Sequence, residues 1–246
     1  SDLEFPAEVG RKAAARAIRK LNGRKVETQC VPVVFDWMVA PMLWSAVFGA
    51  LDGENVHRGL SFLKNKVGKQ IASPAVTLID DPHIPRGLGS SAFDGEGVLT
   101  RKKTVIEKGV LQAYFYDARS ARKYGEEPSG NARRGYGGLP SVSPTNLYLQ
   151  PSETPPEEIV RGIANGFYVT ETMGHGISTV TGDFSVGASG MWIRDGELAF
   201  PVQEVTIAGN MSEMLAKVEL VGSDARFVSS IVSPTFKISE MTVSGT

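Results

Sequence analysis

The sequence has little of the chemistry that metal sites and disulfide frameworks need: one cysteine and three histidines in 246 residues. The single Cys30 excludes an internal disulfide and suits a reducing compartment, so we expect a cytoplasmic protein. His57, His83 and His175 show neither the H-x-H nor the H-E-x-x-H spacing that brings ligands onto one metal. The sequence therefore predicts no metal site and no cofactor in this chain.

Long apolar runs and familiar catalytic motifs are also absent. No window reaches the ~18 apolar residues that cross a bilayer, and the first residues show no signal-peptide pattern, so we expect no membrane contact. There is no G-x-S-x-G elbow and no P-loop lysine. The carboxylate pairs Asp80–Asp81 and Glu126–Glu127 are adjacent in sequence, so they do not point at a common centre. We therefore predict no catalytic residue.

The whole chain has almost no excess of one charge sign, but each of its two parts does. The formal net charge of −1 argues against nucleic-acid binding. Residues 1–140 carry 21 lysines and arginines against 15 acidic residues, whereas residues 141–246 carry 5 against 12. This polarity is typical of a chain that docks with a partner or with its own other half, and two solvated faces would give the same pattern. Because the chain starts at Ser1 without Met, we expect a piece of a longer protein.

What is present is a mixture of short elements with enough apolar residues, 41%, for a sizeable core. Strands outnumber helices, and the helices are interspersed irregularly. This pattern predicts an α+β fold with largely antiparallel β-sheets, sandwich or barrel-like, and several peripheral helices, rather than a doubly wound fold. Helices are predicted at residues 6–22, 41–51, 55–63, 117–124, 154–165 and 213–220, and strands at 31–35, 75–80, 99–107, 110–116, 147–149, 167–170, 203–208, 226–232 and 235–243.

Local signals refine some of these boundaries. Pro32 makes its strand an edge or a strand start, because proline cannot donate to a ladder. Thr154-Pro155-Pro156-Glu157 has the pattern of a capping box. Asp117 is a candidate helix cap, and so is either Asn210 or Ser212 further along the chain.

The stretch Gly174–Gly209 joins two different pieces. Residues 174–190 form a glycine-rich run that we predict to be a loop. Residues 188–194 and 197–202 are strand-like, and Asp195-Gly196 between them is a strong hairpin signal. A glycine-rich loop held against a sheet is typical of a tight turn that lets two backbones pass. It also suits a surface that accepts an extended peptide as an added strand.

Residues 125–144 form the longest stretch without periodicity, and a loop of this length is usually functional or mobile. It contains Arg133, Arg134 and Tyr136, which suit the binding of a carboxylate or of a strand edge.

Several motifs together resemble the PmbA/TldE branch of the TldD/PmbA proteins, once described as modulators of DNA gyrase. The resemblance covers most of the chain from about Val31 onward and implies that this is the carboxy-terminal domain, residues 1–246, of a protein about twice as long. The motifs that carry it are Phe93-Asp94-Gly95-Glu96-Gly97, Glu107-Lys108-Gly109-Val110-Leu111, Ser129-Gly130-Asn131-Ala132-Arg133-Arg134, Thr181-Gly182-Asp183-Phe184-Ser185, Gly187-Ala188-Ser189-Gly190 and Ile207-Ala208-Gly209-Asn210.

The TldD branch carries zinc on an H-E-x-x-x-H helix and a cysteine near the carboxy terminus, and this sequence departs at both places. It has residues 36–44, DWMVAPMLW, where the helix belongs, and residues 229–234, SSIVSP, where the cysteine belongs. The resemblance therefore implies the non-catalytic subunit of a two-subunit peptidase that processes unfolded peptides. Zinc is expected in a TldD-like partner, and we expect a dimer with that partner or with a second copy.

We predict that residues 173–189, together with three residues of the 125–144 loop, border the chamber that holds the peptide. The predicted peptide-binding residues are Arg133, Arg134, Tyr136, His175, Gly182, Asp183 and Gly187. In the alternative, the glycines only permit turns and Arg133 pairs with a local acid such as Asp183. Two other functions stay open: a self-sufficient metallopeptidase that uses the three histidines, and a regulator that acts on DNA gyrase.

Overall fold

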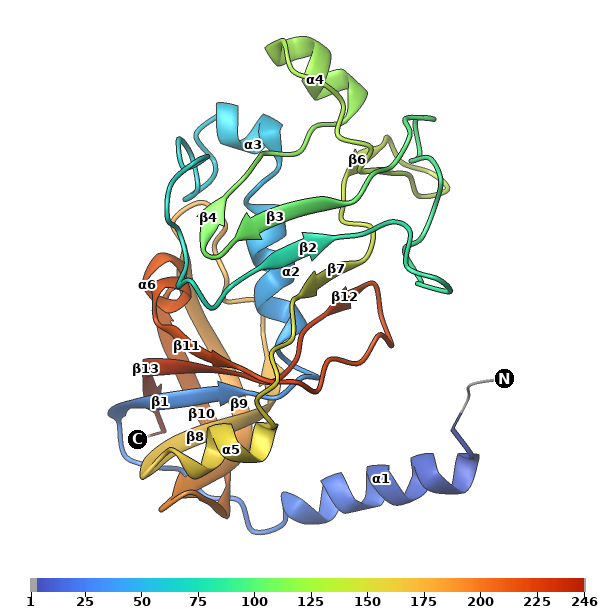
Figure 1. The fold of residues 1–246 in the computed structure, drawn as a ribbon. Coiled ribbons are helices and arrows are strands. Elements are labelled where there is room, and N and C mark those ends of the chain that lie inside the picture. Colours follow the sequence, from blue (N-terminus) through green and yellow to red (C-terminus); the bar gives the residue numbers. More distant parts are fainter. Residues whose placement is uncertain (1–3, 246) are drawn as a thin grey trace.

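The computed structural model describes residues 4–245, which form two large sheets and one two-stranded sheet, with helices between and around them (Figure 1). No helix in this part of the chain is long and apolar enough to cross a membrane. The helices are α1 (Pro6–Arg19), α2 (Pro41–Gly49), α3 (Gly53–His57), α4 (Ala118–Tyr124), α5 (Pro156–Arg161) and α6 (Met211–Ala216). The strands are β1 (Gln29–Phe35), β2 (Leu78–Asp80), β3 (Lys103–Glu107), β4 (Val110–Leu111), β5 (Ala132–Arg133), β6 (Ser141–Val142), β7 (Leu147–Leu149), β8 (Asn165–Met173), β9 (Asp183–Arg194), β10 (Glu197–Asn210), β11 (Val218–Val221), β12 (Ile231–Val232) and β13 (Phe236–Ser244).

The larger sheet closes on itself. Its strand order is β1-β8-β9-β10-β13-β11, and β1 also pairs with β13, so five strands form a ring and β11 extends it. All these pairs are antiparallel except β1 with β8. The α+β prediction with largely antiparallel, barrel-like sheets is therefore confirmed.

The predicted hairpin around Asp195-Gly196 is the longest pairing in the ring. Asp195 and Gly196 have φ of 51° and 80°, the left-handed conformation that a two-residue hairpin turn requires. The pairing runs from Glu197 with Arg194 to Asn210 with Asp183. β9 therefore starts at Asp183, and the prediction of a loop throughout residues 174–190 is wrong for its second half, where the glycines lie inside a strand.

Pro32 does not mark an edge, because β1 has a neighbour on both sides. The register with β13 shifts between Val31 and Val33, so the residue without an N–H falls at an irregularity in the ladder. Pro32 is not a strand start either, because β1 begins at Gln29, so a bulge replaces both alternatives that the sequence predicted.

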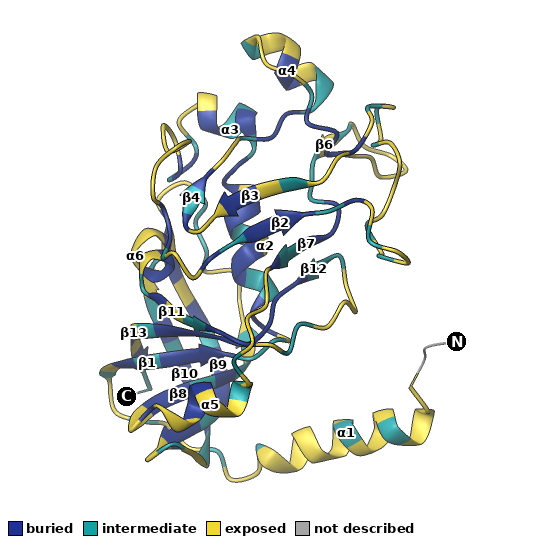
Figure 2. Cartoon of the chain, viewed as in Figure 1, coloured by how far each residue is buried: buried dark blue, intermediate teal, exposed yellow. Residues whose placement is uncertain are grey.

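The smaller sheet has the order β12-β7-β2-β3-β4, with the two-stranded β5–β6 hairpin beside it. α2 lies between the two sheets, and Figure 2 shows it among the most buried elements. One cluster of buried apolar side chains runs from the barrel through α2 into the smaller sheet. In this cluster the rings of Phe35 and Phe236 stack with centroids 5.2 Å apart.

Other boundaries differ from the sequence predictions for local reasons. Pro155 takes the cap position of α5 without a side-chain hydrogen bond, so the predicted capping box does not form. The caps Asp117 and Asn210 are confirmed, since each side chain accepts a backbone N–H of its helix. The helix predicted at 213–220 gives way to β11 at Val218, and the strands predicted at 99–107, 110–116 and 226–232 are shorter.

α1 differs from every other helix in having no buried residue. Figures 1 and 2 show it extending away from the barrel, with only its C-terminal end close to β8 and β9. Lys20, just after the helix, pairs with Glu171 of β8 and fixes that end.

Candidate functional site

The two segments that the resemblance equates with the zinc ligands meet in the core. The indole Nε1 of Trp44, on α2, donates a hydrogen bond to the Ser233 hydroxyl at 3.1 Å. Ser233 in turn donates to the carbonyl of Pro234 at 2.7 Å. Trp44 is fully buried and Ser233 is 1% exposed, so both polar groups are satisfied without water.

Aromatic rings fill the space around this contact. Trp44 packs against Phe236 with ring centroids 5.5 Å apart, and Phe236 stacks on Phe35. Zinc in proteins is held by thiolate, imidazole or carboxylate ligands, usually in a tetrahedron. An indole, an engaged hydroxyl and phenyl rings supply none of these ligands, so the junction does not fit zinc. Within residues 4–245 no group of three or more His, Cys, Asp or Glu is placed to hold a metal ion.

Two carboxylates lie near this junction, and both are already engaged. Asp224 accepts from the N–H and the hydroxyl of Thr235, each at 2.8 Å, and Asp36, which follows β1 directly, accepts two hydrogen bonds as well. Asp36 Oδ2 accepts from the Tyr168 hydroxyl at 2.8 Å, and Oδ1 accepts from the Met38 N–H at 2.9 Å. Burial raises the pKa of Tyr168, and the negative charge of Asp36 raises it further. The hydroxyl therefore stays protonated and donates a hydrogen bond to the carboxylate.

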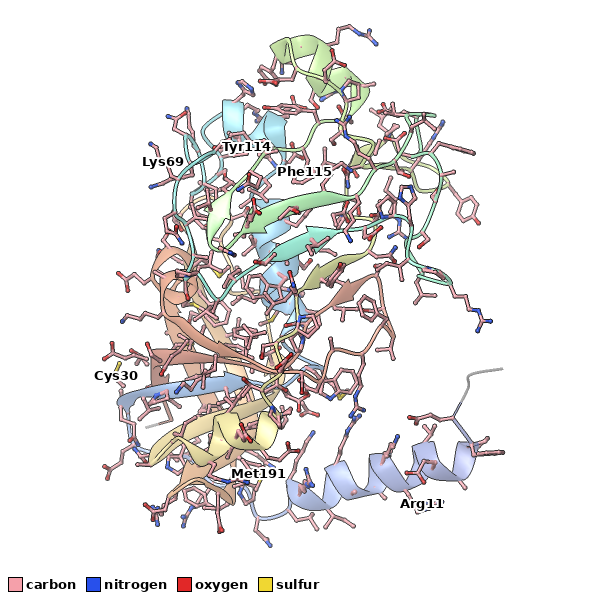
Figure 3. All side chains as sticks on the ribbon, viewed as in Figure 1. Arg11, Cys30, Lys69, Tyr114, Phe115 and Met191 are labelled. Atoms are coloured by element: carbon pink, nitrogen blue, oxygen red, sulfur yellow. The ribbon has the colours of Figure 1, made fainter. Side chains whose placement is uncertain are left out.

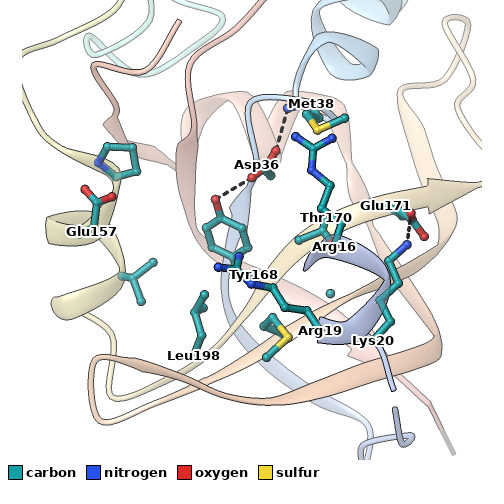
Figure 4. A pocket seen from close by; sticks show the side chains of 14 residues that line it. Arg16, Arg19, Lys20, Asp36, Met38, Glu157, Tyr168, Thr170, Glu171 and Leu198 are labelled. Atoms are coloured by element: carbon teal, nitrogen blue, oxygen red, sulfur yellow. Dashed lines mark hydrogen bonds and ion pairs between the residues drawn. The ribbon is translucent and has the colours of Figure 1, made fainter. Parts of the chain in front are cut away.

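Asp36 and Tyr168 also form part of the wall of a cavity of about 480 Å³ between the C-terminal end of α1, α5 and the barrel (Figure 4). α1 contributes Arg16 and Arg19, and the apolar lining comes from the segment after β1, from α5 and from the barrel: Met38, Pro156, Val160, Met191 and Leu198. The sequence analysis did not single out this cavity, because it depends on where α1 lies and no local motif fixes that position.

Beside this cavity, β8 has a free edge. β1 pairs with β8 only at Phe167, Tyr168 and Val169. After the register shift at Thr170, β8 pairs with β9 from Glu171 to Met173 on one side, and no strand among the described residues pairs with residues 170–173 on the other. A second cavity of about 330 Å³ lies along these residues, and Met38 and Met42 line it. An exposed strand edge of this kind offers backbone groups to an extended peptide.

Three predicted site residues lie together on the β5–β6 hairpin. Arg133, Arg134 and Tyr136 line an open hollow of about 840 Å³ together with residues 141–143. Tyr136 is fully exposed, and no ion pair of Arg133 or Arg134 is present in the described part of the chain.

The other four predicted residues lie on the barrel. His175 is in the exposed loop after β8, and Gly187 pairs inside the β9 ladder. Asp183 accepts from the Thr181 hydroxyl at 2.6 Å, so the structure gives this carboxylate a partner other than Arg133. Gly182 has φ of 81° and accepts the N–H of Met211 at 2.6 Å, a turn that favours glycine.

The two groups are thus carried by different sheets. None of the hydrogen bonds, ion pairs or cavities among residues 4–245 joins the hairpin residues to the barrel residues. That both groups border one peptide chamber stays a prediction.

A buried carboxylate that sequence reasoning missed supports the arginine hairpin. Asp80 is fully buried and accepts from Thr145, through its N–H at 2.7 Å and its hydroxyl at 2.9 Å, and from the Asn131 amide at 2.8 Å. Asp94 accepts the N–H of Ala132 at 3.0 Å. These bonds hold the residues just before Arg133 and the segment that follows β6. A polar residue at the end of an apolar strand was the available signal.

The family is identified by comparison with known proteins. The pattern of the PmbA/TldA metallopeptidase C-terminal domain matches residues 28–245. The Metalloprotease PmbA of Escherichia coli O157:H7 is 37% identical over 245 residues, which is 100% of this chain and 52% of that protein. The chain spans about half the length of the curated relatives it matches.

Solved structures agree with this assignment. A proposed modulator of a DNA gyrase from Thermotoga maritima has a TM-score of 0.90 at 36% identity, covering 99% of this chain and 56% of that one. TldE from Thermococcus kodakarensis has a TM-score of 0.88 at 28% identity, covering 97% of this chain and 55% of that one. The resemblance drawn from the sequence motifs is confirmed, and the chain belongs to the PmbA/TldA metallopeptidase C-terminal domain family.

Proposed function

We propose that this chain is the non-catalytic subunit of a two-subunit zinc peptidase, in which it shapes the chamber and binds unfolded peptide. The observation that carries the proposal is the Trp44–Ser233 contact, because an indole and an engaged hydroxyl occupy the place that the resemblance assigns to the metal of the TldD branch. The name of one relative, Metalloprotease PmbA in Escherichia coli O157:H7, supports the peptidase class, and the name of another, TldE in Thermococcus kodakarensis, supports the TldE branch.

The peptide-binding role is supported by the free edge of β8. Among residues 4–245, no strand neighbours residues 170–173 on one side, and Met38 and Met42 line the adjacent cavity. Backbone pairing at such an edge is independent of the peptide's sequence, and methionine side chains adapt to different neighbours. Arg133 and Arg134 add a positive hollow for a carboxylate.

Zinc and the bond-breaking step belong to a TldD-like partner in this proposal, and assembly is a dimer with that partner or with a second copy. The opposite charge of the two parts of the chain supports docking of this kind. We also propose a cytoplasmic location, because a lone exposed Cys30 suits a reducing compartment.

The test compares the chain alone with the chain mixed with a TldD-like subunit. We expect the chain alone to purify without stoichiometric zinc and to leave an unstructured peptide uncut. With the partner, we expect cleavage that a chelator abolishes and that exceeds the partner's own rate. One tightly bound zinc per chain, together with chelator-sensitive cleavage by the chain alone, would overturn the proposal and favour the self-sufficient peptidase.

The name of the Thermotoga maritima relative favours one further candidate, a regulator that acts on DNA gyrase. The net charge of −1 gives DNA little electrostatic attraction. A salt-dependent shift of DNA mobility at physiological salt, or binding of gyrase subunits in pull-down, would support that candidate; we expect neither.

A further inference from the structure

The cavity under α1 has walls of different character. One wall is the C-terminal end of α1, which presents Arg16 and Arg19; Figure 4 shows both side chains reaching from the helix into the cavity. The facing walls are apolar over much of their area and include Met38, Val160 and Met191. The volume of about 480 Å³ is in the range of sites for small ligands or for one or two residues of a peptide.

Most other charges at this cavity are already engaged. Lys20 pairs with Glu171, and both oxygens of Asp36 accept hydrogen bonds from Tyr168 and the Met38 backbone. Glu157 lines the cavity from α5.

Arg16 and Arg19 differ from Lys20 and Glu171, because neither arginine forms an ion pair with another described residue. Glu157 forms no ion pair among the described residues either. Two unpaired guanidinium groups beside an apolar surface leave donors that a carboxylate satisfies in a bidentate manner.

The geometry points to a binding site for the carboxy-terminal residue of a peptide, with its carboxylate on Arg16 and Arg19 and an apolar last side chain against Met38, Val160 and Met191. This inference rests on the proposed peptide-binding function and adds to it the end of the substrate that is recognised. This cavity shares Met38, Thr170 and Glu171 with the second cavity, which runs along the free edge of residues 170–173. A peptide strand added at that edge therefore has its terminus within reach of Arg16 and Arg19.

The chemistry selects this ligand over a nucleic acid. Three carboxylates, Asp36, Glu157 and Glu171, line the same cavity and repel a polyanion, whereas a single carboxylate needs only the two guanidinium groups. An internal aspartate or glutamate of a peptide presents the same group, so the test separates the two sources.

The experiment measures fluorescence anisotropy of a labelled, unstructured peptide that ends in leucine, prepared as the free acid and as the amide. We expect the free acid to bind the chain about tenfold more tightly, the effect of one charge-assisted contact. The double variant Arg16→Ala, Arg19→Ala should bind both peptides at the level of the amide. Alanine preserves the helix, so α1 should remain folded in circular dichroism.

Arg11→Ala is the matched control, because Arg11 lies on the same helix, pairs with Glu8 and does not line the cavity (Figure 3). It should keep the full preference for the free acid. An amidated peptide with one internal glutamate should bind like the plain amide; binding as tight as that of the free acid would overturn recognition of the terminus.

The binding measurements distinguish failure of the proposed peptide-binding function from failure of the inference that Arg16 and Arg19 bind the peptide's carboxy terminus. If neither peptide binds, the proposed peptide-binding function is wrong. If both bind equally well, that function stands and this inference is wrong. If the free-acid preference survives the double variant but is lost in Arg133→Ala, Arg134→Ala, the terminus lies in the β5–β6 hollow and this inference is also overturned.

Discussion

The indole nitrogen of Trp44 donates to the hydroxyl of Ser233 across 189 residues of sequence, and this contact ties α2 to the segment before β13. Because Trp44 is fully buried, Trp44→Ala should lower the free energy of unfolding by about 3–5 kcal/mol. Trp44→Phe keeps most of the packing and loses one hydrogen bond, so it should cost about 1 kcal/mol from that bond, plus a smaller packing loss. Urea denaturation measures both.

Trp37→Ala is the matched control for this prediction. Trp37 is half-buried, and its ring lies 4.6 Å from the Arg226 guanidinium carbon. Losing a cation–π contact at an accessible site should cost about 1 kcal/mol. If Trp44→Ala is no more destabilising than Trp37→Ala, the contact does not hold the two segments together.

The raised pKa of Tyr116 predicts how the free energy of unfolding changes at alkaline pH. Burial raises the pKa of this phenol from the model-compound value of 10.0 to about 12, and nearby Glu126 contributes to the shift. The unfolded state therefore loses this proton first, so stability is unaffected below about pH 10 and falls as the pH rises from about 10 to about 12. Tyr116→Phe should remove this component, so the difference between variant and parent unfolding free energies should change across that window. A constant difference would contradict the assignment.

Asp80 should be essential for the arginine hairpin. In the parent protein the Asp80 carboxylate accepts hydrogen bonds from Thr145 and Asn131. Asp80→Asn keeps the shape of the side chain but places an amide N–H₂, itself a donor, against one of these donors. Leaving buried donors unpaired should cost about 2–4 kcal/mol. Hydrogen exchange should quicken at residues 131–133 and 145 before the barrel strands are affected.

Asp81→Asn provides the comparison, since Asp81 accepts one backbone N–H and pairs with the exposed Lys102. A change of less than about 1 kcal/mol is expected there. Equal effects at positions 80 and 81 would show that the buried network does not fix the hairpin.

The sequence predicted what short-range chemistry determines. The Asp195-Gly196 hairpin and the caps Asp117 and Asn210 follow from residues within one turn of each other, and all three are confirmed. The closure of the barrel was not predictable, because the pairing of β1 with β13 joins residues about 200 positions apart. The rule that proline marks an edge strand fails at Pro32, because a bulge accommodates this proline in β1, which pairs with both β8 and β13.

In the candidate site too, the sequence predicts what depends on neighbouring residues and misses what depends on long-range contacts. Arg133, Arg134 and Tyr136 share a hollow because they are neighbours on one hairpin. The position of α1 over Tyr168 depends on contacts that no local pattern records, so the cavity with Arg16 and Arg19 emerged only from the structure.

The double variant Arg133→Ala, Arg134→Ala tests whether the β5–β6 hollow borders the peptide chamber. In complex with a catalytic TldD-like partner, we expect peptide turnover to fall at least about tenfold, because loss of charge-assisted contacts of roughly 1.5–3 kcal/mol acts on substrate binding. Assembly and thermal stability should be unchanged, since neither guanidinium has an ion-pair partner among the described residues. Arg122→Ala on α4 removes an exposed positive charge elsewhere and should leave turnover at the parent rate. Unchanged turnover in the double variant would remove the hollow from the chamber, and dissociation of the complex would assign the two arginines to the subunit interface instead.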